Sequence, residues 1–137
     1  MTYQKLIIIG RLGKDPEMRF TPAGQPVTSF SVATDRQYAD QSGKQVKETI
    51  WFRVQAWGKL AETCKNFLQK GKLVMVEGRL SVDASTGAPK IWTDQSGNPR
   101  TNLEIVAGTV KFLSGGQQQE QTQQEQMQID TGEDIPF

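Results

Sequence analysis

Apolar and polar residues alternate along most of the first 113 positions, which predicts a domain built mainly from β-strands. Strands are expected at Lys5–Leu12, Val27–Thr34, Val46–Trp57, Leu73–Val82, Lys90–Thr93 and Thr101–Phe112. Segments rich in Gly, Pro, Asp and Ser separate several of these strands and predict turns. These turns are expected at Thr21–Gly24, Asp40–Lys44, Ala84–Pro89 and Asp94–Pro99.

One segment has helical spacing instead. Between Lys59 and Lys70 the apolar residues fall on one helical stripe, and Gly71 follows as a stop signal. The stripe consists of Leu60, Ala61, Cys64, Phe67 and Leu68. Three strands, a helix and further strands is the order of an OB-fold, a five-stranded barrel with its helix between strands 3 and 4. Other small barrels have similar element counts, so the pattern by itself leaves them open.

The composition changes after Leu113. Residues 114–128 are mostly Gln, Glu and Gly, which bury too little apolar surface to offset the entropy of ordering, and they predict a disordered linker. Apolar residues return in 129–137 among acidic ones, which predicts a separate tip. The expected organisation is therefore a domain at 1–113, a linker at 114–128 and an acidic tip at 129–137.

The charges divide in the same way. The chain has 16 basic and 15 acidic residues, and every basic residue lies within 1–113, which carries a net charge of +6. Residues 114–137 carry five acidic residues and no basic one. A basic domain predicts a polyanionic partner, and an acidic tail predicts a different one.

Composition disfavours an enzyme. The chain has no histidine, which removes the commonest general base and metal ligand, and its one cysteine excludes an internal disulfide. That cysteine, Cys64, is expected in the core. The carboxylate pairs Asp15 with Glu17 and Glu133 with Asp134 are interpreted as solvated charge. No signal peptide opens the chain, so we expect it to stay in the compartment where it is made.

The segment Val46–Trp57 carries the most informative alternation. One face consists of Ile50, Phe52, Val54 and Ala56, which predicts a core face. The other face consists of Lys47, Thr49, Trp51, Arg53, Gln55 and Trp57. Tryptophans on a polar, basic face fit single-stranded nucleic acid, whose bases stack on aromatic rings while cations follow the phosphates. Packing of these tryptophans under a loop or in a subunit interface is the alternative.

A second face repeats the pattern, because Lys90 and Trp92 lie on one side of a short strand that leads to a hairpin tip. Trp92 is a candidate clamp, with a role as an interface anchor as the alternative. Tyr38, just before the Asp40–Lys44 turn, is a further candidate, although such a residue often only covers a core edge. The candidates for phosphate contact are Lys47, Arg53, Lys59, Lys90 and Arg100.

Several short motifs, in this order, resemble the bacterial single-stranded DNA-binding proteins. They are Gly10–Glu17, Trp51–Val54, Gly58–Ala61, Val76–Leu80, Trp92–Gly97 and the final Asp134–Phe137. The resemblance implies an OB-fold that forms a homotetramer, binds single-stranded DNA without a cofactor and acts in bacterial replication, recombination and repair. It also implies a cytoplasmic, nucleoid-associated location and stacking residues at Tyr38, Trp51, Trp57 and Trp92.

The resemblance assigns the acidic tip to the docking of replication and repair proteins, through Asp134, Ile135, Pro136 and Phe137. An apolar anchor beside carboxylates suits a partner that offers an apolar pocket and a cation. The tip is also expected to compete mildly for the basic DNA site. A tail that only aids solubility is the alternative.

The chain departs from the family in the Ala84–Pro89 turn, which resembles an insertion, and in a short, Gln-rich linker. Three other functions remain to be separated by experiment. They are an RNA-binding OB or cold-shock-like module, a nuclease that uses the basic face for its substrate, and an adaptor that acts through its tail alone.

Overall fold

The computed structural model describes residues 1–113, which form eight strands and one helix. In chain order these are β1 (Leu6–Leu12), β2 (Glu17–Phe20), β3 (Pro26–Ala39), β4 (Gln45–Trp57), α1 (Lys59–Phe67), β5 (Leu73–Ser81), β6 (Ile91–Thr93), β7 (Pro99–Thr101) and β8 (Leu103–Phe112). The predicted linker at 114–128 and the tip at 129–137, with Asp134, Ile135, Pro136 and Phe137, lie outside the described residues.

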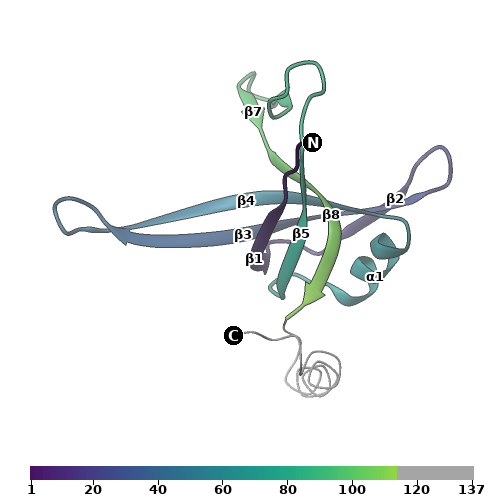
Figure 1. The fold of residues 1–137 in the computed structure, drawn as a ribbon, viewed down its shortest axis with the longest axis horizontal. Helices are drawn as coiled ribbons and strands as arrows, with labels where there is room; N and C mark the ends of the chain where they lie inside the picture. The colour runs from purple at the N-terminus through teal and green to yellow at the C-terminus, as the bar shows by residue number, and fades with distance from the viewer. Residues whose placement is uncertain (114–137) are drawn as a thin grey trace.

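Five strands close into a barrel in the order β1-β5-β8-β4-β3, and β3 pairs again with β1 (Figure 1). Closure depends on β1, which pairs with β5 over Leu6–Arg11 and with β3 at its last two residues. Gly10 permits this crossing, because a Cβ atom there would lie 2.0 Å from the carbonyl oxygen of Ala33. The predicted OB-fold is confirmed, with α1 between the third and fourth barrel strands.

The core fills the barrel between the alternating inward residues of its strands. Val32, Val54, Val74, Val76 and Ile105 are completely buried. The helix covers one end of the barrel, where Thr28 donates a 2.6 Å hydrogen bond from its hydroxyl to the carbonyl oxygen of Ala61. Cys64 lies in the core as predicted, and burial raises the pKa of its thiol to about 12.

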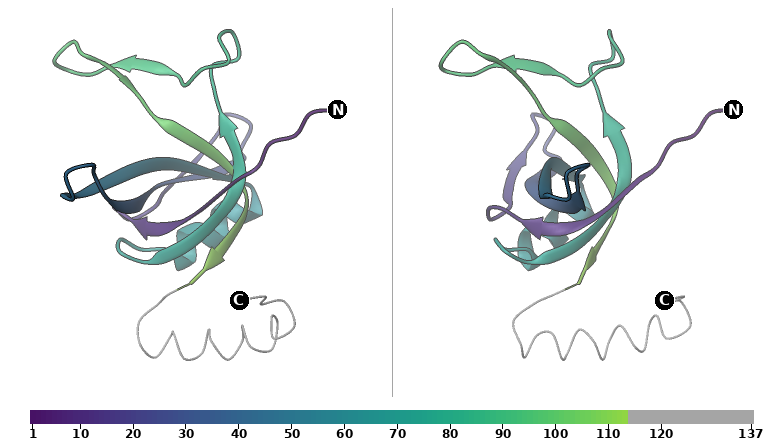
Figure 2. Two further views of the ribbon diagram at one scale, coloured as in Figure 1. Left: turned by 60° about the vertical axis from the view of Figure 1, so that its left-hand side comes forward. Right: turned by 90° about the vertical axis from the view of Figure 1, so that its left-hand side faces the viewer.

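Two ribbons project from the barrel (Figures 1 and 2). In the first, β3 and β4 pair without interruption from Val27 opposite Trp57 to Ala39 opposite Gln45, and the outer half forms a long arm. The second is the β6–β7 hairpin, a two-stranded sheet separate from the barrel sheet. Within residues 1–113, no helix has the length and apolar character needed to cross a bilayer.

The tips of both ribbons have the same turn chemistry, because both contain the sequence Asp-Gln-Ser-Gly. In the arm, the Asp40 carboxylate accepts hydrogen bonds from the Ser42 side chain and from the backbone N–H groups of Ser42 and Lys44. These bonds lower the pKa of Asp40. In the hairpin, Asp94 accepts from the backbone of Ser96 and Asn98, and also from Arg100.

The structure corrects several details of the predicted elements. A short strand, β2, precedes the Thr21–Gly24 turn, and the predicted strand at Thr101–Phe112 is divided at Asn102 into β7 and β8. The helix ends at Phe67 instead of Lys70. Phe67, predicted on the apolar stripe, is exposed and packs on the Phe112 ring, with 5.9 Å between the ring centroids. Ile50, predicted as core, is exposed because it lies where β4 leaves the barrel.

Candidate nucleic-acid interface

The outward face of β4 carries two exposed tryptophans. Phe52, Val54 and Ala56 point into the core, so the residues between them point outward by strand alternation. Trp51 is 53% exposed and Trp57 is 40% exposed, fractions that are high for such large rings. The alternation predicted from the sequence is therefore confirmed from Trp51 to Trp57, although not at Ile50, and neither ring lies in the core of this chain.

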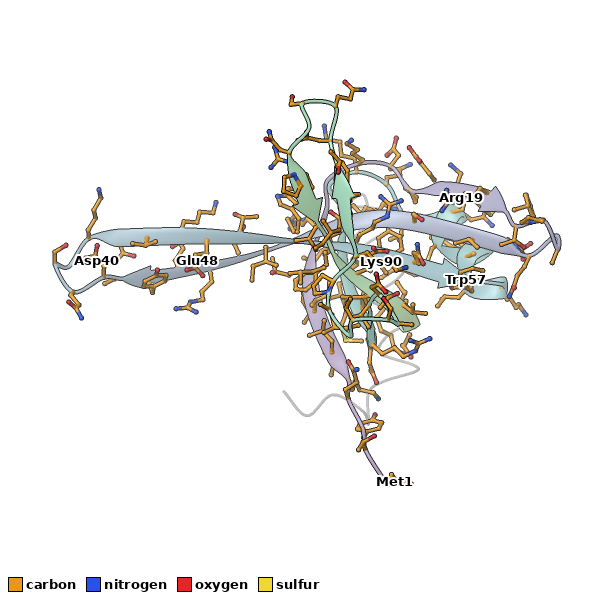
Figure 3. The ribbon with its side chains drawn as sticks, turned by 90° about the horizontal axis from the view of Figure 1, so that it is seen from above. Met1, Arg19, Asp40, Glu48, Trp57 and Lys90 are labelled. Atoms are coloured by element: carbon orange, nitrogen blue, oxygen red, sulfur yellow. The ribbon has the colours of Figure 1, made fainter. Side chains whose placement is uncertain are left out.

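The strands beside β4 extend this face. Trp57 pairs with Val27, and Val27 pairs with Arg19 of β2, so these residues form one row across three strands. Arg19 and Trp57 lie at the same end of the molecule in Figure 3. Sequence analysis missed Arg19 because it did not recognise β2. The charge of Arg19 is suited to a phosphate beside a base at Trp57.

Trp92 is carried by the projecting β6–β7 hairpin and is 48% exposed. It pairs with Arg100 across the hairpin, which places an indole and a guanidinium on one side of the ribbon. With its amide oriented to satisfy its neighbours, Asn102 accepts a 3.3 Å hydrogen bond from the indole N–H of Trp92. This bond uses the edge of the ring and leaves a face available for stacking.

The structure does not bring Tyr38 onto the face that carries Trp51. Tyr38 pairs with Val46, and both belong to the alternate set of arm positions that continues into the core side of β4. Its ring is half-buried, with the Arg36 guanidinium 4.6 Å from the ring centroid, and its hydroxyl donates to Glu48 at 3.2 Å. The negative charge of Glu48 raises the pKa of Tyr38. A stacking role for Tyr38 stays a prediction.

The five candidate phosphate contacts differ in their surroundings. Arg53 is exposed on the β4 face between Trp51 and Gln55, and it lies beside Glu104 of β8 in the sheet. Lys47 lies 3.9 Å from Asp35 on the arm. Arg100 donates from Nε to Asp94 at 2.9 Å, which is the main reason why the pKa of Asp94 is lowered. Arg100 and Lys47 therefore already have acidic neighbours.

The other two candidates, Lys59 and Lys90, are exposed at the start of α1 and just before β6. Lys90 follows the Ala84–Pro89 turn. Hydrogen bonds from Ser85 lower the pKa of Asp83, and the charge of Lys90 adds to this effect. Of the five candidates, only Arg53 lies between Trp51 and Trp57 on the outward face of β4.

This surface combines exposed aromatic rings with positive charge. Its tryptophans are exposed, its cations lie on the same strands, and no three of His, Cys, Asp and Glu gather into a metal-ligand set within residues 1–113. Stacking on aromatic rings is tolerant of sequence because every base has a π-face.

Residues 3–113 match the Single-strand binding protein family along the whole described domain. The chain belongs to this family. Members include the single-stranded DNA-binding protein of Neisseria meningitidis serogroup A, 41% identical over 115 residues, which cover 84% of this chain and 62% of the relative. The protein from Caldanaerobacter subterraneus is 44% identical over 109 residues, which cover 80% and 67% of the two chains. The chain therefore spans about three fifths of the length of the Neisseria relative.

Solved structures of the family share the fold. The single-stranded DNA-binding protein from Thermus aquaticus, solved as a deletion mutant, superposes with a TM-score of 0.64 and 28% identity, over 82% of this chain and 51% of that one. The Plasmodium falciparum SSB, solved in complex with single-stranded DNA, superposes with a TM-score of 0.68 over 83% of this chain and 97% of that one. At 24% identity the second likeness shows the fold alone.

Proposed function

We propose that this family member binds single-stranded DNA with little sequence preference, in the bacterial cytoplasm and in association with the nucleoid. In this role it coats and protects strands exposed during replication, recombination and repair, and it acts by binding rather than catalysis. The observation that carries the proposal is the outward face of β4, where Trp51 and Trp57 flank Arg53 with both rings exposed. Unpaired bases stack on such rings, whereas the bases of a duplex are already stacked.

The names of the similar proteins support the same ligand. The relatives from Neisseria and Caldanaerobacter are both single-stranded DNA-binding proteins. The absence of histidine from the sequence removes the usual general base, which supports a binder over an enzyme.

Titration of the tryptophan fluorescence with poly(dT), run beside a sizing measurement, tests the proposal. We expect strong quenching, saturation at a defined number of nucleotides per protein, and affinity that falls with salt. Duplex DNA of equal length should bind far more weakly at the same salt. Equal affinity for duplex would contradict the proposal, tighter binding of poly(U) would indicate an RNA-binding module, and Mg²⁺-dependent cleavage would indicate a nuclease.

The proposal includes assembly as a homotetramer. On β1, Ile7 and Ile9 point away from the core and are each 55% exposed. Among residues 1–113, only β5 pairs with β1 over Leu6–Gly10, which leaves the other edge of β1 available for a strand from a second copy. Replacing Ile7 and Ile9 together by Thr should dissociate the assembly without unfolding the barrel, as sedimentation and circular dichroism would report.

The tip, Asp134–Phe137, is proposed to recruit replication and repair proteins. Its apolar and acidic residues are separated by residues 114–128 from a domain that carries the basic charge. Deleting residues 130–137 should abolish capture of such partners while strand affinity stays equal or rises slightly at low salt. The Phe137→Ala variant is the finer test. Partner capture that survives both changes would leave the tail with a role in solubility only.

A further inference from the structure

The end of β1 lies beside Trp51 on the same side of the sheet. Arg11 pairs with Ala33, and Ala33 pairs with Trp51, so the three residues form one row across β1, β3 and β4. Residues directly opposite each other in paired strands point to the same face. Arg11 and Trp51 are therefore two strand spacings apart, about 10 Å, with only the methyl group of Ala33 between them.

Gly13 provides the surface on which the Trp51 ring rests. A Cβ atom built on Gly13 would lie 2.5 Å from Cζ3 and 2.7 Å from Cη2 of Trp51. Separations this short cannot be tolerated, so any other residue at this position would push the indole away. The backbone here is held in place, because the N–H of Gly13 donates to the carbonyl oxygen of Ser31 at 3.1 Å. One part of the indole thus packs on the main chain.

We propose that Arg11 and Gly13 are a further part of the DNA interface, in which Gly13 seats the Trp51 ring and Arg11 binds the phosphate that follows the base stacked there. The inference rests on the proposed function, since it takes single-stranded DNA as the ligand. It extends the strand path from β4 across Ala33 to the end of β1.

The Arg11 side chain is held at the barrel end. Its Nη1 donates to the carbonyl oxygen of Gly71 at 2.9 Å, in the loop that leads into β5, the strand on the other side of β1 from β3. The loop at Gly71 is itself fixed, since the N–H of Gly71 donates to the carbonyl oxygen of Leu12 at 2.8 Å. A planar fork held by one N–H keeps other donors for a phosphate and loses little entropy on binding it.

The Arg11→Gln variant tests the phosphate contact. The slope of log affinity against log salt for poly(dT) should become shallower by about 0.7, the value for one neutralised phosphate on a single strand. The matched control is Lys65→Gln, which removes the same charge from α1, where the Lys65 ammonium donates to the carbonyl oxygen of Pro16. An Arg11→Gln slope equal to that of the parent, or a Lys65→Gln slope reduced as much, would overturn the contact.

The Gly13→Ala variant tests the seat. In the parent, the ring current of Trp51 should shift the Gly13 Hα resonances upfield, and Trp51→Leu should remove that shift. Gly13→Ala should then weaken poly(dT) binding about tenfold in the parent but add no loss in a Trp51→Ala background. The control is Gly108→Ala, because the new methyl group would lie 3.7 Å from the backbone oxygen of Glu77, an ordinary van der Waals distance. Melting temperatures verify that every variant folds.

The readouts separate this inference from the proposed function. If no ring-current shift is present at Gly13, or if Gly13→Ala weakens binding equally with and without Trp51, the seat is wrong even though DNA binding stands. If the shift is present but Trp51→Ala binds poly(dT) as tightly as the parent, the stacking role in the proposed function fails. The Arg11 slope is read independently of both.

Discussion

The two places that carry tryptophans differ in how they are supported. Trp51 and Trp57 stand on β4, a central strand of the closed barrel, with fully buried residues directly behind them. Trp92 stands on a hairpin of two three-residue strands that belongs to no larger sheet. The barrel core holds the two tryptophans of β4 in place, whereas a two-stranded hairpin outside a larger sheet is only marginally stable by itself. In the proposed complex, ordering the hairpin would therefore reduce what stacking on Trp92 contributes. Under the proposed function, Trp51 and Trp57 would form a fixed stacking face, and Trp92 an adjustable clamp.

The largest effect should come from a matched truncation in the two regions. Ile105→Ala removes a completely buried side chain from the barrel and should lower the free energy of unfolding by about 2–5 kcal/mol. Ile91→Ala removes a side chain that is 76% exposed on the hairpin, and it should change the free energy of unfolding by less than about 0.5 kcal/mol. Urea denaturation followed by circular dichroism measures both. Similar losses would mean that the hairpin folds as part of the barrel.

A smaller difference is expected in DNA affinity. Trp51→Ala should weaken binding of a short dT oligonucleotide by about 1–3 kcal/mol. Trp92→Ala should cost less, because ordering the hairpin offsets part of what stacking contributes, by about 0.5–1.5 kcal/mol for each side chain that binding immobilises. Fluorescence anisotropy of a labelled oligonucleotide at one salt concentration gives both values. A larger loss for Trp92→Ala than for Trp51→Ala would reverse the assignment of fixed face and clamp.

The smallest expected effect is a loss of hairpin stability at low pH. The Arg100 side chain, with help from backbone N–H groups, lowers the pKa of Asp94 below its ordinary 3.8. A carboxylate whose folded pKa is lowered stabilises the fold above its unfolded pKa, and this contribution is lost as pH falls through the folded pKa. Below pH 3.8 the hairpin should therefore loosen, and the Trp92 indole N–H resonance should move. Asp94→Asn should abolish that pH-dependent movement, and its persistence would exclude Asp94 as the cause.

Sequence alternation predicted the barrel face well because β4 is buried on one side only. Phe52, Val54 and Ala56 fix the inward positions, and strand geometry then places Trp51 and Trp57 outward without further information. The same rule assigns Tyr38 to the other face, but this becomes visible only when the pairing of β3 with β4 is known.

Other features depended on contacts between distant segments. β2 is only four residues long and contains no buried position, so it leaves no alternating pattern to detect. The division at Asn102 arises because the hairpin diverges from the barrel there, which the sequence does not encode as Gly or Pro. The proximity of Arg11 and Gly13 to Trp51 follows from barrel closure between β1 and β3, a long-range pairing that a single sequence does not reveal.

The buried thiol of Cys64 also makes the protein convenient to label. It is the only cysteine in the chain, and its raised pKa keeps it in the unreactive protonated form at neutral pH. A cysteine introduced at Ser42, on the tip of the arm, would then be the one site that a maleimide dye modifies. Without any background substitution, the arm and the hairpin could each carry a dye, so their movement toward a bound strand could be followed in single molecules.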